Sequence, residues 1–198
     1  MLEIIGEDDI IMVLSDHGAK SMVGGVCVNQ WLMREGLLTL KNQPGGIARI
    51  EDCAIDWAKT RAWSSGGYYA RVFFNVEGRE PQGLIPAATY ESFRDEIIHR
   101  IESMCGPDGE LLGNRALKPQ DIYSRVEGTA PDLIVYWGDL RWRSVGSVGY
   151  EDIFTRENDI GPDDANPDHY GIGILDNHSG RGGQEVQGVP VFDTVDDA

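Results

Sequence analysis

The stretch DDIIMVLSDHGAK, residues 8–20, joins an apolar run to two side chains that can bind a metal. The segment from Asp9 to Leu14 is apolar after its acidic start, which predicts a strand buried on both faces in a parallel sheet. Asp16 and His17 follow at the end of this strand, where α/β proteins bind ligands. A carboxylate and an imidazole suit zinc, manganese or iron. Asp16 and His17 are therefore candidate metal ligands, and a turn with an incidental histidine is the alternative.

Helical and extended patterns alternate along the rest of the chain. VNQWLMREGLL has apolar residues at helical spacing, with Gly36 as a C-terminal cap, and residues 68–76 have the composition of a strand. TYESFRDEIIHRIESMCGP predicts an amphipathic helix that Thr89 can cap and Gly106-Pro107 ends. PDLIVYW and YGIGIL predict two further strands. The expected fold class is α/β.

Composition narrows the possible partners. The 198 residues include 33 acidic and 17 basic side chains, and the net charge of −16 argues against a nucleic-acid surface or an anionic membrane surface. Three cysteines without a CxxC pair form neither a disulfide framework nor a zinc finger. The sequence shows neither a leader nor an apolar run of membrane-spanning length. We expect a cytoplasmic protein.

Two other acidic segments contain histidine. Asp95 and His99 share one face of the predicted amphipathic helix, and a solvated i,i+4 pair is the better interpretation. The loop ENDIGPDDANPDHYG, residues 157–171, resembles a calcium loop at its start but lacks the required Gly and the final Glu. It is either a polar turn or the source of another ligand. Phosphate-binding loops, a dinucleotide fingerprint and a nucleophile elbow are absent from the sequence.

An ordered series of motifs resembles the type I phosphodiesterase/nucleotide pyrophosphatase family of the alkaline phosphatase superfamily. The series runs VLSDHG, VNQWLMREGLL, RAWSSGGYYARVFFNVEGREPQG, PDLIVYW, WRSVGSVG, ENDIGPDDAN and YGIGIL. The resemblance extends from about Asp9 to Leu175, and NVEGREPQG and GPDDAN are its most specific parts. It implies a partial alkaline-phosphatase-like mixed sheet with flanking helices. The prediction is one domain over residues 1–198, with a possible cap or insert at about residues 25–165.

The resemblance implies two-metal hydrolysis of a phosphodiester or nucleotide, with zinc or manganese as the metals. Asp16 and His17 match the family's Asp-His metal ligands. The family's late histidine usually stands where this chain has Pro167, so His169 is the candidate that replaces it. The nucleophile and the remaining ligands of the family precede the Asp-His strand, and no catalytic residue is assigned to this chain.

Because the family's nucleophile and several of its ligands are missing, we expect this chain to be the C-terminal part of a longer enzyme and to be inactive alone. We also expect that it forms a homo-oligomer or lacks an N-terminal half. The expected substrate is a small phosphoester. One alternative is a non-catalytic binding or assembly module with the same fold. The other is phosphoryl transfer of the phosphoglycerate-mutase type.

Overall fold

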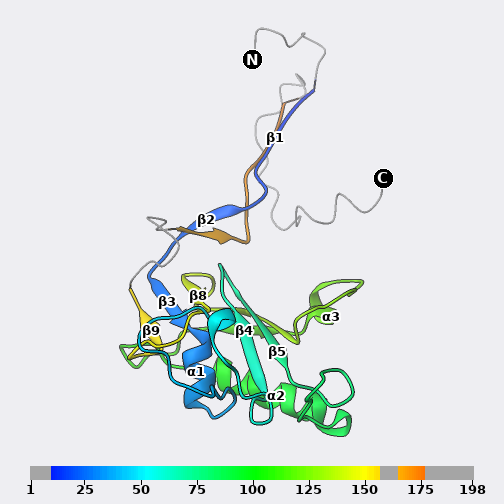
Figure 1. Ribbon diagram of the computed structural model, residues 1–198. Coiled ribbons are helices and arrows are strands. Elements are labelled where there is room, and N and C mark those ends of the chain that lie inside the picture. Colours follow the sequence, from blue (N-terminus) through cyan, green and yellow to red (C-terminus); the bar gives the residue numbers. More distant parts are fainter. Residues whose placement is uncertain (1–9, 157–164, 177–198) are drawn as a thin grey trace. The chain divides into compact units, whose positions relative to one another are not determined.

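The computed structural model describes residues 10–156 and 165–176, which divide between two compact units (Figure 1). The smaller unit comprises residues 1–20 and 167–198, and the larger unit comprises residues 21–166. The assignment of one domain over 1–198, and of a cap over about 25–165, remains a prediction.

A four-stranded antiparallel sheet is the main element of the larger unit. Its order is β4 (Ala62–Ser65), β5 (Ala70–Phe74), β7 (Leu133–Tyr136) and β6 (Arg115–Leu117). Side chains alternate between the two faces, so Ala62, Val72 and Phe74 are buried while Trp63 and Phe73 are only half-buried. The predicted strands at 68–76 and in PDLIVYW are confirmed within these bounds.

A second sheet places β3 (Gly24–Cys27) between β8 (Trp142–Val145), which is parallel to it, and β9 (Phe154–Thr155), which is antiparallel. Helix α1 (Val28–Arg34) continues directly from β3. Gly36 has φ +68°, the left-handed conformation that ends helices and that glycine adopts without strain. The predicted helix and its glycine cap are confirmed.

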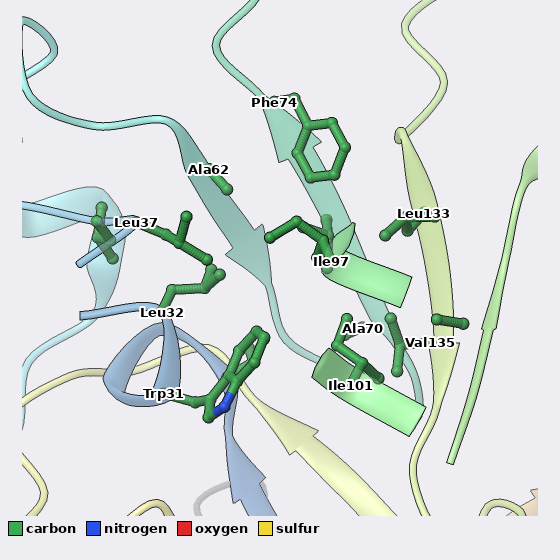
Figure 2. Packing of buried hydrophobic residues seen from close by; sticks show 14 of the residues in the cluster. Trp31, Leu32, Leu37, Ala62, Ala70, Phe74, Ile97, Ile101, Leu133 and Val135 are labelled. Carbon is green, nitrogen blue, oxygen red and sulfur yellow. The ribbon is translucent and has the colours of Figure 1, made fainter. Parts of the chain in front are cut away.

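Helix α2 (Tyr90–Glu102) packs against the buried face of the main sheet. Phe93, Ile97 and Ile101 are at most 4% exposed, and Figure 2 shows Ile101 beside Ala70 and Val135 of the sheet. The predicted apolar stripe therefore forms the core contact. Thr89 does not cap the helix through its side chain, because its hydroxyl donates to the Pro86 carbonyl instead. The short helical segments are η2 (Ile50–Asp52), η3 (Ala87–Thr89) and α3 (Pro119–Ile122).

The smaller unit corrects the prediction for the opening strand. The strand β1 (Ile11–Leu14) exists, but it pairs antiparallel with β11 (Gly173–Asp176) in a two-stranded sheet. Met12, Val13 and Leu14 are 52–61% exposed, so the strand is not buried on both faces. A two-stranded sheet has no second neighbour or second layer with which to cover apolar side chains. In the same way β2 (Gly18–Ser21) has one partner among the described strands, β10 (Ala165–Asp168).

The architecture is thus a mixed α/β fold with several small sheets and few helices, as the sequence predicts. Within the described ranges, no helix is long and apolar enough to cross a membrane.

Candidate functional site

Asp16 and His17 lie in the turn between β1 and β2, with side chains 88% and 52% exposed. The His17 ring is oriented by the backbone of the next residue, because Nδ1 lies 2.7 Å from the Gly18 carbonyl oxygen. A proton on Nδ1 donated to that carbonyl leaves Nε2 as the free lone pair, an arrangement common in metal-binding histidines. His17 Nε2 is 3.8 Å from Asp16 Oδ2. Two ligands on one tetrahedral metal lie about 3.4 Å apart, so this pair is near the spacing required.

The segment around His169 lies against this turn within the smaller unit. Ser15 N donates to the Ile172 carbonyl at 2.9 Å, and Ile172 N donates to Ser15 Oγ at 2.6 Å. A Cβ added at Gly18 would lie 2.0 Å from the Tyr170 carbonyl oxygen, and one at Gly171 would lie 2.5 Å from Ser15 Oγ. Only glycine allows the two segments to approach so closely.

The neighbouring segments do not complete a metal site. Among residues 10–156 and 165–176, no group of three or more His, Cys, Asp and Glu side chains could hold a metal. His169 is exposed, and Asp159, Asp163 and Asp164 of the acidic loop lie outside the described residues. The donor types fit zinc or manganese, but two converging donors do not fit the four ligands of a closed zinc site.

Asp168, from the same acidic loop, is already engaged. Its carboxylate lies 3.1 Å from Lys20 Nζ and accepts a hydrogen bond from the His169 backbone N–H at 2.8 Å. Partial burial acts to raise the pKa of Asp168, but the Lys20 hydrogen bond and the His169 N–H outweigh it, so the pKa is lowered. This carboxylate therefore contributes to local structure.

The Asp95/His99 pair does not converge on a ligand either. Asp95 Oδ1 lies 2.8 Å from Lys118 Nζ and is 65% exposed, while Lys118 also contacts Glu91 at 2.9 Å. The two hydrogen bonds to Asp95 and Glu91 raise the pKa of Lys118. Asp95 and Glu91 thus form ion pairs with Lys118 on the α2 surface. The solvated i,i+4 pair of Asp95 with His99 stays a prediction.

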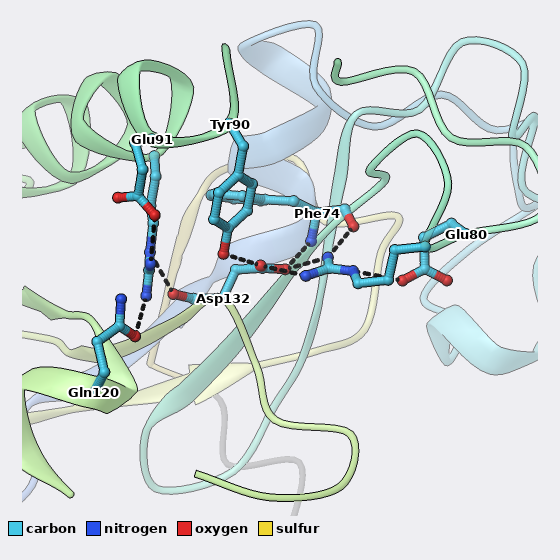
Figure 3. A network of polar contacts seen from close by, with 8 residues as sticks. Phe74, Glu80, Tyr90, Glu91, Gln120 and Asp132 are labelled. Carbon is cyan, nitrogen blue, oxygen red and sulfur yellow. Dashed lines mark hydrogen bonds and ion pairs between the residues drawn. The ribbon is translucent and has the colours of Figure 1, made fainter. Parts of the chain in front are cut away.

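The motifs NVEGREPQG and PDLIVYW meet at the buried carboxylate of Asp132, shown in Figure 3. Arg79 donates to both Asp132 oxygens at 2.8 Å, and Tyr90 Oη donates to Oδ1 at 2.5 Å. Phe74 N donates to Oδ2 at 2.6 Å. On the other side, Arg94 Nε donates to the Asp132 carbonyl at 3.0 Å. This network ties α2 and the 75–83 loop to the start of β7.

The network also raises the pKa values of two of its side chains, Tyr90 and Arg79. Burial and the hydrogen bond to Asp132 raise the pKa of Tyr90 to about 12. The hydrogen bonds and charge of Asp132 raise the pKa of Arg79 above its ordinary value despite partial burial. Arg79 therefore stays positively charged over the ordinary pH range, and we interpret the role of the network as structural.

Two buried asparagines fix the remaining motifs. Asn29, in VNQWLMREGLL, donates to the carbonyls of Ser64 and Gly146 at 2.8 and 2.7 Å and accepts from Ser64 N. Asn75 donates to the carbonyls of Trp57, Thr60 and Gln82 at 2.8–3.0 Å. Sequence reasoning did not identify these side chains or Asp132. Their signal was a polar residue inside or directly beside an apolar run.

The polar residues of these motifs thus stabilise the fold through buried hydrogen bonds from side chains to the backbone. The turn that contains Asp16 and His17 is exposed and does not take part in these bonds. The family model for type I phosphodiesterase / nucleotide pyrophosphatase matches residues 4–164. The chain belongs to this family, and its mixed α/β architecture is consistent with a partial alkaline-phosphatase-like fold. Asp16 and His17 lie inside the matched residues, whereas His169 lies beyond them. Neither the curated proteins nor the solved structures gave a match.

Proposed function

We propose that this chain is part of a metal-dependent hydrolase of phosphodiesters or nucleotides and supplies the Asp16-His17 pair as ligands of one divalent metal. The family, whose members are generally metal-dependent, supports the hydrolase class. The observation that carries the ligand assignment is the 3.8 Å spacing of His17 Nε2 and Asp16 Oδ2, with Nδ1 held by a backbone carbonyl. Zinc and manganese suit a carboxylate and an imidazole. His169 is proposed as a ligand of a second metal.

Calorimetric titration with zinc chloride and manganese chloride tests the ligand pair. Loss of one ligand by His17→Ala or Asp16→Ala is expected to lower affinity by about tenfold or more. His99→Ala is the matched control, because His99 is an exposed histidine of α2 in the larger unit. Equal affinities of His17→Ala and the parent chain would refute the assignment. A matching loss in His99→Ala would mean that zinc binds exposed histidines at random.

We expect the isolated chain to have little or no phosphodiesterase activity. The described residues gather no third metal ligand beside Asp16 and His17, and no catalytic nucleophile is assigned. A nitrophenyl phosphodiester with added zinc or manganese measures this directly. Turnover that Asp16→Ala abolishes would contradict the expectation of inactivity while supporting the metal assignment.

A non-catalytic binding or assembly module is the second candidate. The exposure of Asp16, His17 and His169, together with the lack of a three-donor group in the described part of the chain, favours it. Absence of any zinc or manganese binding in the same calorimetry would select this module.

The exposed apolar residues of the smaller unit support a partner there. Four apolar residues of the two-stranded sheet, Met12, Val13, Leu14 and Ile174, are 52–61% exposed. Ile172, directly before β11, is 69% exposed. We propose that a second copy, or another part of the enzyme, covers them. Size-exclusion chromatography with light scattering is expected to give a mass above 21.9 kDa for the chain alone, and Met12→Lys is expected to lower it. A monomer at all concentrations would exclude a second copy.

A further inference from the structure

The larger unit contains a second candidate site, a pocket of about 380 Å³ on the outer face of β4 and β5. Its wall includes three aromatic rings, Trp57, Trp63 and Phe73, and the rim includes Glu51 and Cys53. The volume falls in the range of small-molecule sites. The whole pocket lies in residues 50–73, so it is independent of Asp16 and His17.

The rings are arranged by the strand register. Trp63 and Phe73 are cross-strand partners, and their rings stack with centroids 5.6 Å apart and planes at 19°. Trp57 stands almost perpendicular to Trp63, at 82° with centroids 4.9 Å apart. All three residues are half-buried, so ring surface remains open to a ligand. The stacked pair and the third ring at right angles to Trp63 form an angular aromatic wall.

The one formally charged residue among the described residues that line the pocket is negative. Of the described residues that line it, Glu51 is the one with a formal charge, and no Lys or Arg is among them. Burial raises the pKa of the Cys53 thiol, and the negative charges of Asp52 and Glu51 raise it further. Arg49 contacts Glu51 at 3.6 Å, but the two side chains are 75% and 58% exposed, so this pair is weak. Arg71 shares the outer face of β5 beside Ser65 but does not line the pocket.

We propose that this pocket binds an organic cation of the quaternary ammonium class. Aromatic faces attract such cations through their quadrupoles, and a carboxylate at the rim adds Coulomb attraction. A nucleobase is less suited, because the lining offers few free polar groups for its edge. Ser64 Oγ already donates to the carbonyls of Ser65 and Arg71. Ser65 Oγ has no hydrogen-bond partner among the described residues, but it is buried and offers no accessible group to a base edge.

Titration with choline chloride, followed by tryptophan fluorescence and calorimetry, tests the proposal. The neutral isostere 3,3-dimethyl-1-butanol has the same shape without the charge, and binding about tenfold weaker is expected for it. Trp63→Leu is expected to weaken choline binding by about tenfold, and Glu51→Gln by about threefold. Glu110→Gln, an exposed glutamate outside the pocket, is the control for the same change in net charge.

The exposed Glu51→Gln variant keeps the test valid if Trp63→Leu fails to fold. Equal affinity for choline and its neutral isostere would overturn the proposal, since the pocket would then be only apolar. Equal losses of choline affinity in Glu51→Gln and Glu110→Gln would also overturn the proposal, because they would indicate attraction by the net charge of the protein. Stronger binding of adenosine than of choline, or no binding of choline, would also overturn it.

Discussion

Replacement of Asp132 by Asn is the most direct test of what stabilises the larger unit. The Asp132 side chain is 2% exposed and accepts four hydrogen bonds, two from Arg79, one from Tyr90 and one from Phe74 N. Asn has a similar shape, but it lacks the charge and presents an NH2 group to donors. Hydrogen bonds to a charged group contribute about 1.5–3 kcal/mol each, though not additively.

The expected loss is smaller than the sum of these bonds. Arg79 is 44% exposed, so water can solvate its guanidinium when the carboxylate is removed. Breaking a buried ion pair typically costs about 3–5 kcal/mol, and this partly exposed partner places the expected loss near the lower end, at about 3 kcal/mol. For a unit of this size, the melting temperature would fall by about 6–12 °C.

Urea unfolding followed by tryptophan fluorescence measures this loss. All five tryptophans lie between residues 31 and 142, so the signal reports the larger unit. Asp121→Asn is the control, because Asp121 is exposed in α3 and its change is expected to cost less than about 1 kcal/mol. A loss below about 1 kcal/mol in Asp132→Asn would refute the structural role of the network. Additive losses of Asp132→Asn and Tyr90→Phe in a double-mutant cycle would refute their coupling.

Three further predictions concern pH and two glycines. The folded state raises the pKa of Tyr90 from 10 to about 12, which means that it favours the protonated hydroxyl. This preference stabilises the fold below pH 10 by at most about 2.7 kcal/mol, and by less because Tyr90 is partly exposed. The contribution is lost as the pH rises to 12. Unfolding free energies should therefore fall more steeply above pH 10 in the parent than in Tyr90→Phe, and equal slopes would contradict this. Gly36→Ala is expected to cost about 1 kcal/mol in urea unfolding, because φ is +68° and no atom lies within 4 Å of the added Cβ. Gly45→Ala, equally open but without positive φ, should be neutral. Gly171→Ala should weaken zinc binding several-fold in calorimetry by displacing the turn before Asp16, while Gly173→Ala, whose nearest neighbour is at 3.4 Å, should not.

The elements with clear periodicity could be predicted from the sequence. The apolar stripe of α2 and the glycine that ends α1 depend on local spacing and on backbone conformation, and both are found as predicted. The surroundings of β1 could not be predicted in this way. An apolar run shows that a strand has surface to bury, but not how many neighbours cover it, and β1 has one antiparallel partner in the described structure.

For the polar residues too, the sequence could predict local features but not contacts between distant segments. Asp16 and His17 follow a strand, as the sequence pattern indicates, but that strand is antiparallel rather than part of a parallel sheet. Their role as metal ligands stays a prediction. The roles of Asn29, Asn75 and Asp132 depend on backbone groups that lie 7 to 117 residues away in the sequence, and periodicity does not specify those contacts. The motifs that identified the family are thus largely the residues that hold its fold together.

Stability and proposed chemistry therefore depend on different parts of the chain. The buried network around Asp132 and the core of α2 lie in residues 21–166, while Asp16 and His17 lie in the smaller unit and are more than half exposed. Exposed side chains with few partners contribute little to folding free energy. Substitution of Asp16 or His17 should leave urea unfolding of the larger unit unchanged. A loss of metal affinity in these variants can then be attributed to the lost ligand, because the tryptophan fluorescence would show that the larger unit is still folded.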